Sequence, residues 1–292
     1  MPHTRRMSIE DQVKSNLGQK KAFGESRHEA KIVGKADEKI FSHNTMNTYV
    51  RECINFARWC RDQYGDTKVS RMDTHAAEYM QHLRDSGRSP WSQKAILSGL
   101  RKLYGNDNEH LRDIRTDARH RTDITRSRLD TPMARHFSET KNAELINFCE
   151  KTGLRRSELE HLTGDRVTYK GDQAYISDVS GKGGRVRDVL ILGNDQAVID
   201  KIQNTPAGDL VWGRVHSAAN IHGYRADYAA ELYREYARPV EELRDEERYI
   251  ARADMAGEVF DRAALQIVAE NLGHSRVSIC VQNYLYDLED TE

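Results

Sequence analysis

The sequence predicts a mainly α-helical protein with one small antiparallel β-sheet, divided between two domains. From residue 44 to residue 104, apolar residues recur three and four positions apart, which is the spacing of one face of amphipathic helices. Between residues 166 and 192 the pattern changes to short apolar runs separated by glycine turns, which predicts three antiparallel strands. A chain of 292 residues is long enough to bury two hydrophobic cores.

Composition favours a globular cytoplasmic protein. The chain is 38% hydrophobic and 31% charged, and no apolar run approaches the ~18 residues of a membrane span. The first residues contain no apolar signal region. The four cysteines are scattered and form no Cys-x-x-Cys pair, so we expect reduced core thiols rather than a metal site. These are Cys53, Cys60, Cys149 and Cys280.

The small net charge of -1 conceals an uneven distribution. Residues 1–130 contain 25 Lys and Arg against 18 Asp and Glu, an excess of 25 - 18 = +7. Residues 131–292 contain the other 20 and 28, an excess of 20 - 28 = -8. A basic half suggests a polyanionic partner for that half, with solvated helix faces as the plainer alternative.

The first 110 residues are predicted to be helical. Residues 1–40 are polar and read as an N-terminal extension, with short helices near 8–20 and 27–35. A helical domain then occupies residues 41–110. Its three helices are predicted from residue 44 to Gly65, from Asp73 to Ser86, and from the Ser89-Pro90 start, a capping serine followed by proline, to about residue 104.

Residues 111–130 are predicted to link the two domains, because apolar residues become sparse there while arginines accumulate. Arginine suits the geometry of phosphate, so this connector can cross a nucleic-acid backbone. A solvated connector without a ligand is the alternative. The arginines of the segment are Arg112, Arg115, Arg119, Arg121, Arg126 and Arg128.

Residues 131–292 are predicted to form a second, α+β domain. Ser138 can cap its first helix, which Gly153 ends. The strands of residues 166–192 follow, and a further hairpin is predicted from Tyr249–Ala253 and Glu258–Phe260. The remaining helices are predicted at Arg155–Leu162, 195–203, 217–237 and Arg262–Glu270.

Five short motifs of this domain contain residues that carry chemistry. A tyrosine hydroxyl has a pKa near ~10 in water, so it becomes a useful nucleophile only beside cations and a proton acceptor. Each motif alone is weak, since surface arginines, loop lysines and satisfied histidines are common. In chain order they are Thr152-Gly-Leu-Arg155, Lys182 in a Gly-Lys-Gly-Gly turn, His222-Gly-Tyr-Arg225, Leu272-Gly-His274 and Tyr284.

This ordered set resembles the tyrosine recombinase (phage integrase) family. The resemblance covers roughly residues 40–286. The amino-acid sequence of the motifs is closer to that of integrases of bacterial mobile elements than to that of Xer-type resolvases. It implies a helical core-binding (SAM-like) domain followed by the catalytic domain. It also implies a bacterial, DNA-associated enzyme that acts as a homotetramer on double-stranded DNA at specific sites, with accessory excision or DNA-bending proteins as further partners.

The resemblance implies a role for each motif in cutting and rejoining DNA. Arg155 and Arg225 would clamp the scissile phosphate and stabilise the charge that develops on it. Lys182 would protonate the departing 5′ oxygen. No metal ion, ATP or other cofactor is implied.

The nucleophile and its proton acceptor complete the implied set. Tyr284 would attack to form a 3′-phosphotyrosine, while His274, and less strongly His222, would bind the phosphate or accept the tyrosine proton. Tyr284 lies ten residues after His274 instead of the family's nine, so a one-residue insertion is inferred, with Tyr286 as the alternative nucleophile.

Two further departures from the family bear on assembly. The longer interval before His274 is assigned to an insertion at 238–257, and the tail after Tyr284 is short for exchange between subunits. The alternative functions are a Xer-like resolvase, a topoisomerase-like nicking enzyme, or a DNA-binding regulator that has lost catalysis.

Overall fold

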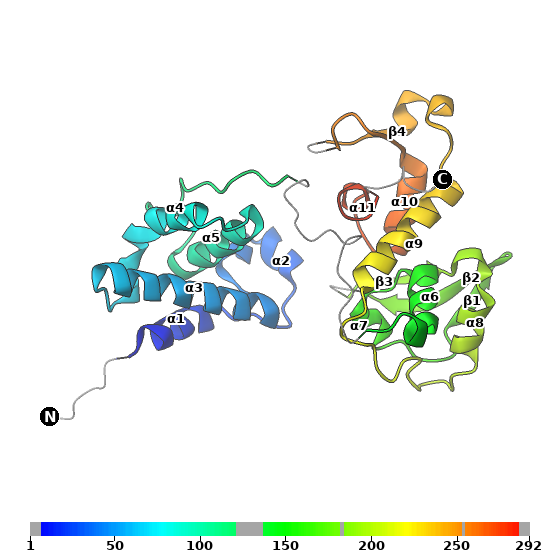
Figure 1. Cartoon of the computed structure of the whole chain (residues 1–292), viewed down its shortest axis with the longest axis horizontal. Coiled ribbons are helices and arrows are strands. Elements are labelled where there is room, and N and C mark those ends of the chain that lie inside the picture. Colours follow the sequence, from blue (N-terminus) through cyan, green and yellow to red (C-terminus); the bar gives the residue numbers. More distant parts are fainter. Residues whose placement is uncertain (1–6, 121–136, 182–183, 253–254, 286–292) are drawn as a thin grey trace. The chain divides into compact units, whose positions relative to one another are not determined.

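The chain forms two compact units, Met1–Asp123 and Ile124–Glu292, and each has its own hydrophobic core. Figure 1 shows the elements of both units in the computed structural model. The structure describes residues 7–120, 137–181, 184–252 and 255–285.

Unit 1 is helical, as its periodicity predicts. Each of four helices begins at a serine whose hydroxyl accepts a hydrogen bond from the backbone N–H three residues later, which satisfies a donor that the helix start leaves open. The helices are α1 (Ile9–Gly18), α2 (Arg27–Ile32), α3 (His43–Tyr64), α4 (Ala76–Asp85) and α5 (Pro90–Tyr104), with short 3-10 segments at Ala36–Glu38 and Val69–His75.

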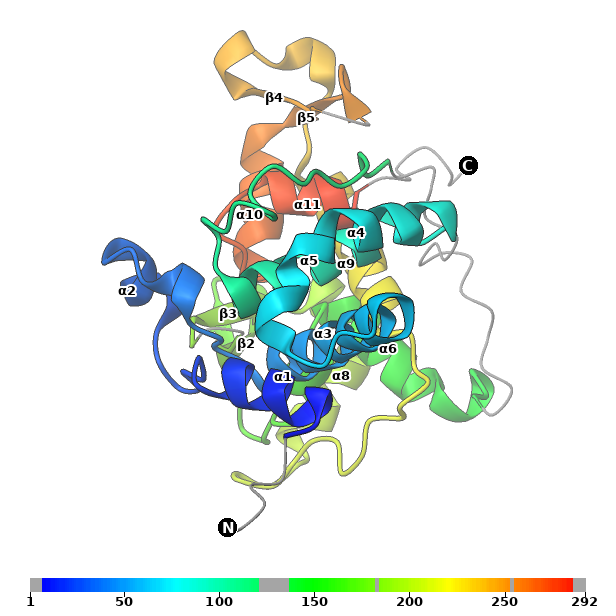
Figure 2. The same ribbon diagram turned by 90° about the vertical axis from the view of Figure 1, so that its left-hand side faces the viewer.

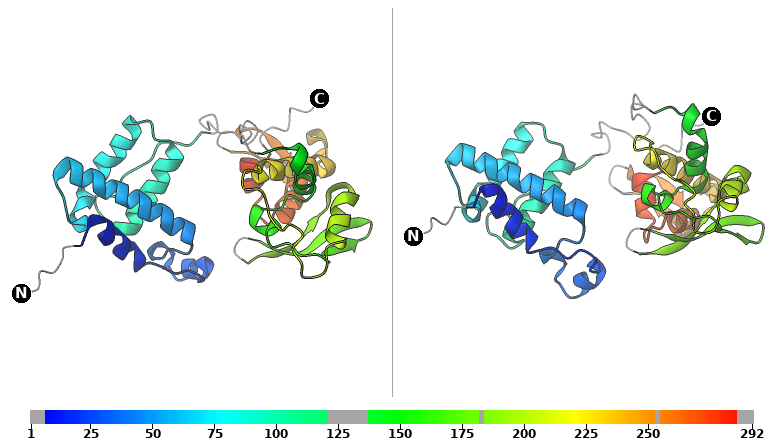
Figure 3. Two further views of the ribbon diagram at one scale, coloured as in Figure 1. Left: turned by 60° about the horizontal axis from the view of Figure 1, so that its bottom comes forward. Right: turned by 90° about the horizontal axis from the view of Figure 1, so that it is seen from below.

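The core of unit 1 is built around α3, which packs against α1 and α5. Gly99 allows this close approach, because a Cβ there would lie 3.3 Å from the Tyr49 ring. Figure 3 shows α1, in dark blue, lying along α3. Through Val13 and Leu17, which are fully buried, α1 belongs to this core although it was expected in a separate N-terminal extension.

The expected linker begins on unit 1 rather than in solvent. Leu111 is fully buried, and the Arg101 guanidinium donates to the carbonyl oxygens of Leu111 at 3.1 Å and Ile114 at 3.0 Å. Asp117 accepts a hydrogen bond of 2.8 Å from Gln93. Periodicity does not report arginine-to-carbonyl bonds of this kind, so these contacts with unit 1 could not be predicted from it.

Unit 2 is α+β. Its helices are α6 (Ala143–Thr152), α7 (Arg156–Leu159), α8 (Gln196–Gln203), α9 (Ile221–Tyr236), α10 (Arg262–Asn271) and α11 (Ser278–Asn283). Short 3-10 segments lie at Thr140–Asn142, Leu192–Asn194, Val240–Glu242 and Asp245–Glu247. The strands are β1 (Val167–Lys170), β2 (Gln173–Ser180), β3 (Val186–Leu190), β4 (Arg248–Ile250) and β5 (Val259–Asp261). The predicted fold class, mainly helical with small antiparallel sheets, is confirmed.

The three-stranded sheet has the order β1-β2-β3 and is antiparallel throughout. Ile176 is central, because it pairs with Val167 on one side and Val189 on the other. The predicted helix after Arg155 is shorter than expected and ends at Leu159. The reason is that the following residues leave the helix, and the Leu162 carbonyl accepts from the N–H of Val211 at 2.9 Å.

The helix α9 packs against α6 and α10 in the core of unit 2. Tyr228 on α9 is fully buried, and its hydroxyl donates to the Leu190 carbonyl at the end of β3 at 2.9 Å. Gly153 ends α6 with φ of 58°, and a Cβ there would lie 2.3 Å from the Tyr228 ring. Glycine is therefore required at this position, where the chain turns toward the candidate active site.

The predicted second hairpin is confirmed as β4 and β5, which pair antiparallel and follow α9 and precede α10 in the sequence (Figure 2). Ala253, the expected end of its first strand, lies outside the described residues. It is held by Arg238, which donates to both carboxylate oxygens of Asp261 at 2.8 and 3.1 Å. All four cysteines are free and buried, as expected. In the part of the chain that the structure describes, no helix is long and apolar enough to cross a membrane.

Candidate active site

Arg155 and Glu158 form the first part of the site, at the start of α7. The backbone N–H of Arg155 donates to Glu158 Oε2 at 2.8 Å, so the glutamate caps its own helix. The Arg155 side chain donates from Nη1 to Glu158 Oε1 at 2.7 Å and from Nη2 to the Leu272 carbonyl at 3.0 Å. These two bonds fix the plane of the Arg155 guanidinium.

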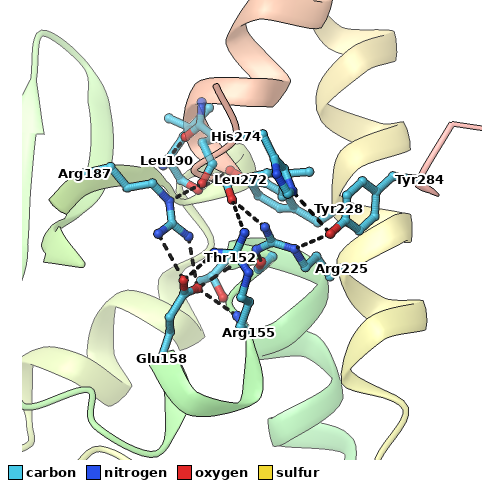
Figure 4. Close-up of polar contacts among 12 residues, drawn as sticks. Thr152, Arg155, Glu158, Arg187, Leu190, Arg225, Tyr228, Leu272, His274 and Tyr284 are labelled. Carbon is cyan, nitrogen blue, oxygen red and sulfur yellow. Dashed lines mark hydrogen bonds and ion pairs between the residues drawn. The ribbon is translucent and has the colours of Figure 1, made fainter. Parts of the chain in front are cut away.

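Arg225 is almost fully buried, with 1% of its surface exposed. It projects from the second turn of α9, and its Nη1 and Nη2 donate to the carbonyl oxygens of Gly153 and Leu272. Its Nε donates to the Tyr284 hydroxyl at 3.2 Å. The Leu272 carbonyl therefore accepts from both Arg155 and Arg225 and holds the two guanidiniums together (Figure 4).

Tyr284, just after α11, is mostly buried with its hydroxyl inside the arginine cluster. His274 Nε2 lies 3.4 Å from the Tyr284 hydroxyl, and the guanidinium carbon of Arg225 lies 5.4 Å from the centre of the tyrosine ring. The centroid of the His222 ring lies 5.5 Å from that of Tyr284. The tyrosine thus contacts three of the residues that the sequence singled out.

A pocket of about 390 Å³ opens beside these groups. The first turn of α9 contributes to its wall, and helix starts favour anions because their backbone N–H groups point outward. Arg156 also lines the pocket, but its guanidinium donates to backbone carbonyls, including those of His216 and Ala219 at 3.0 Å each. The lining residues are Arg155, Arg156, Ala219, Asn220, Ile221, His222, Arg225 and Tyr284.

The charges of the cluster do not cancel. Glu158 lies within 4.0 Å of Arg155, Arg187 and Arg225, so these four side chains have a net charge of 3 - 1 = +2. Burial alone raises the pKa of Glu158, but hydrogen bonds and charge from Arg187, together with Arg155, lower that pKa to about 2. The glutamate is therefore ionised at neutral pH, and the excess positive charge remains for an anionic ligand.

His274 is neutral at neutral pH. Burial, followed by the positive charges of Arg225, Arg155 and Arg187, lowers its pKa to about 4. The negative charge of Glu158 opposes this shift, because it raises the pKa of His274. A neutral imidazole beside the Tyr284 hydroxyl can accept a proton from it.

The depressed pKa of His274 predicts a pH dependence of stability. A histidine in the unfolded chain has a pKa of ~6.5. Between that pH and about 4, His274 is therefore protonated in the unfolded chain and neutral in the folded chain. The stabilisation is therefore present above pH ~6.5 and is lost as the pH falls toward the folded pKa. As the pH is lowered from ~6.5 to about 4, we expect the free energy of unfolding, measured by urea titration, to fall less for His274→Gln than for wild type. An identical pH slope for both proteins would contradict the burial of His274 among arginines.

Arg187 is a residue of this site that the sequence argument missed. Its side chain donates from Nη1 to Glu158 Oε1 at 3.1 Å and from Nη2 to Oε2 at 3.0 Å. A signal was present, because strand alternation places Arg187 on the same face as the fully buried Val189 and Ile191. A charged residue in register with core positions indicates a buried ion pair.

The structure leaves part of the predicted site undescribed. Lys182, Arg121, Arg126 and Arg128 lie outside the described residues. The other linker arginines belong to unit 1 and make local contacts. Arg112 pairs with Asp113 at 3.2 Å, Arg115 donates to the Arg112 carbonyl at 2.9 Å, and the Arg119 guanidinium lies 5.9 Å from the Trp91 ring centre.

Solved structures with the same arrangement of elements exist. The Tn1549 transposon integrase in complex with circular intermediate DNA has a TM-score of 0.52 and 14% identity, over 95% of this chain and 96% of that one. Its complex with transposon right end DNA gives 0.51 and 14%, over 97% of each chain. XerH site-specific recombinase bound to a palindromic difH substrate gives 0.47 and 16%, over 95% and 85%. No protein-family model and no curated protein matches the sequence.

At these identities the integrase structures establish the fold. The chain has the same fold as the Tn1549 transposon integrase, which agrees with the fold class predicted from its motifs. Among the described residues, no three His, Cys, Asp or Glu side chains lie close enough to hold a metal ion.

Proposed function

We propose that this chain is a tyrosine site-specific recombinase, which cuts and rejoins double-stranded DNA through a 3′-phosphotyrosine intermediate. One observation carries the proposal. The Tyr284 hydroxyl lies 3.2 Å from Arg225 Nε and 3.4 Å from His274 Nε2, beside a pocket that Arg155 also lines. Nucleophile, proton acceptor and anion-binding groups thus meet at one point.

The two arginines would bind the scissile phosphate. The Arg225 guanidinium is held by two backbone carbonyls, and that of Arg155 by the Glu158 carboxylate and the Leu272 carbonyl. Each Nη of the two arginines has a second N–H in addition to the one already used. Attack by the tyrosine increases the negative charge on the phosphate, and the cluster's net charge of +2 complements that charge. Donors that are fixed before the reaction stabilise such a state without reorganisation.

The chemical step exchanges one phosphate ester for another. A bond forms between the Tyr284 oxygen and phosphorus as the bond from phosphorus to the 5′ oxygen breaks, and His274 accepts the tyrosine proton. His222 is proposed to hydrogen-bond the phosphate from the first turn of α9. The 5′ oxygen leaves as a hydroxyl, and attack by a 5′ hydroxyl of another strand reverses the step, so no energy source is needed.

Lys182, which lies between β2 and β3 in the sequence, is proposed as the acid that protonates the leaving 5′ oxygen. A positioned acid accelerates departure of a poor leaving group by ~10²–10⁴-fold, whereas a thiolate leaves without one. We expect Lys182→Ala to cleave normal DNA far more slowly than wild type, and DNA with a 5′-bridging sulfur at nearly the wild-type rate. Gel assays of single-turnover cleavage on both substrates measure this. Equal defects on both would exclude Lys182 as the acid, and Arg155→Ala, which sulfur should not rescue, is the control.

DNA is the proposed partner, since the integrase structures of the same fold were determined with transposon DNA. We propose that both units bind the duplex, that four copies assemble on two recombination sites, and that the natural role is integration and excision of a mobile element. The DNA-binding arginines of 112–128 and accessory proteins that bend DNA remain part of this proposal. A regulator without catalysis would not need a tyrosine held within reach of Arg225 and His274.

The test begins with the DNA site. Binding sites are selected from random duplexes with the purified chain, and duplexes carrying the selected site are then nicked near the point of cleavage. Loss of the short fragment traps the covalent intermediate. We expect a protein–DNA band that survives denaturing gels with no added nucleotide. Tight, site-specific binding without any such band would favour the regulator instead.

A further inference from the structure

We propose that Arg187 is a positioning residue of the active site, which holds the Arg155 guanidinium and the turn before His274 in one fixed arrangement. The proposal rests on the recombinase function above. Arg187 is not among the described residues that line the pocket, and 6% of its side-chain surface is exposed, so we infer that it acts through its neighbours. It comes from β3, while the groups it holds come from α7 and α10.

The first contact of Arg187 is with Glu158. The two side chains form a forked pair with distances of 3.0 and 3.1 Å, and both are almost fully buried, with 6% and 1% of their side-chain surfaces exposed. Glu158 binds Arg155 with the same two oxygens. Arg155 and Arg187 therefore approach one carboxylate from different sides (Figure 4), and loss of Arg187 would release one side of Glu158.

The second contact is with the end of α10. Arg187 Nε donates to the Asn271 carbonyl at 2.6 Å, and the Asn271 side chain accepts from the N–H of Leu190 on β3 at 2.7 Å. Gly273 follows with φ of 67°, and a Cβ there would lie 3.1 to 3.2 Å from the Arg187 side chain. Arg187 thus packs against the backbone on both sides of Leu272.

The Leu272 carbonyl makes this contact important for catalysis. It accepts hydrogen bonds from both Arg155 and Arg225, and His274 follows two residues later. A shift of this backbone would move the two guanidiniums and the imidazole together. Misplacement of reacting groups by ~1 Å can cost about 10²-fold in rate, so the position of this turn determines the cleavage rate.

Arginine is required for these contacts. Its planar fork can bind both oxygens of Glu158 while Nε binds Asn271, and the single ammonium of lysine cannot satisfy all three acceptors. Arg187→Lys retains the charge and most of the volume but loses this geometry. Arg187→Met also removes the charge, which at present helps to lower the pKa of His274.

The matched control is Arg238→Lys. Arg238 also makes a forked pair with a buried carboxylate, that of Asp261, but it supports the β4–β5 hairpin and contacts none of the active-site groups among the described residues. Both substitutions remove a fork to a buried carboxylate, although the Arg238 side chain is 42% exposed and that of Arg187 is 6% exposed. A purely structural contribution would therefore lower the rate of each variant only in proportion to its own unfolded fraction.

We expect Arg187→Lys to lower the single-turnover cleavage rate about 10²-fold while its DNA dissociation constant stays within about 3-fold of wild type. Arg238→Lys should cleave at the wild-type rate, even where its melting temperature falls as much. If Arg187→Lys and Arg238→Lys lose rate only in proportion to their unfolded fraction, the proposal is overturned.

The pH profile supplies a readout that instability does not move. His274 is surrounded by Arg225, Arg155, Arg187, Glu158 and Tyr284, and removing the positive charge of Arg187 must raise its pKa. The acid limb of the cleavage rate should therefore move to higher pH in Arg187→Met and less in Arg187→Lys. An unmoved acid limb in Arg187→Met, with wild type still forming the covalent complex, refutes the role of Arg187 and leaves the recombinase function standing. Absence of the complex in wild type would reject the function itself.

Discussion

Tyr284→Phe is expected to abolish covalent attachment to DNA while leaving DNA binding within a few fold of wild type. Phenylalanine keeps the ring among Arg225, His222 and His274 but lacks the attacking oxygen. The hydrogen bonds of the hydroxyl with Arg225 Nε and His274 Nε2 are lost, and each such bond contributes about 0.5–1.5 kcal/mol of stability. Denaturing gels with the nicked substrate measure attachment, and mobility shifts measure binding.

Tyr286→Phe is the control for this prediction. Tyr286 is the alternative nucleophile of the sequence argument and lies outside the described residues. Its variant should form the covalent complex normally. If Tyr284→Phe still gave the band and Tyr286→Phe did not, the nucleophile would be Tyr286.

Arg225→Lys is expected to lower the cleavage rate by at least ~10²–10³-fold, the range found when one fixed donor to a developing oxyanion is removed. Arg225 has three hydrogen bonds in a fixed plane, to Gly153, Leu272 and Tyr284. Lysine keeps the charge but not the fork, so the carbonyl oxygens lose donors and the tyrosine loses its partner. We expect a lower melting temperature and almost unchanged affinity for DNA.

Arg244→Lys is the matched control, because it is the same substitution at an exposed site. Arg244 pairs with Glu246 and Glu247 on the surface of unit 2, where exchange of one cation for another has little effect. Its cleavage rate should equal that of wild type. Cleavage by Arg225→Lys within a factor of three of wild type would show that the fork is not needed for the chemistry.

Much of the fold could be predicted because its signals are periodic. The apolar spacing of α3 and α5 is uninterrupted, and the glycine turns around β2 separate short apolar runs, so both patterns survive in the final structure. The contacts of residues 111–117 with unit 1 were not predicted, because they produce no periodic pattern of apolar residues. Residues 111–117 are held by Arg101 and Gln93 through backbone and carboxylate acceptors, which leaves no apolar pattern to read.

The candidate site was predictable to the extent that its residues occur in motifs. The structure brings Arg155, Arg225, His274 and Tyr284 together, as their order in the chain suggested. The Leu272 carbonyl could not be identified as the common acceptor of both arginines. Every residue has a backbone carbonyl, so the sequence does not indicate which of them accepts hydrogen bonds from side chains.

Arg187 escaped notice for a different reason. It stands among charged and apolar residues in a strand, where one arginine looks like a solvated edge residue. The strand alternation that places it on the buried face was overlooked, and the pairing of β3 with β2 and the packing of α10 against β3 show its side chain in the core of the site. The structure therefore mainly identifies the residues and backbone groups that position the motif residues.

The most direct test of the proposed function is to identify the chemical link between the wild-type chain and DNA. The trapped complex is digested with protease and nuclease, and the modified peptide is sequenced by mass spectrometry. The proposal predicts a nucleotide joined through its 3′ phosphate to the oxygen of Tyr284, with a free 5′ hydroxyl on the released strand. A link through a 5′ phosphate, or through any residue other than Tyr284, would contradict it.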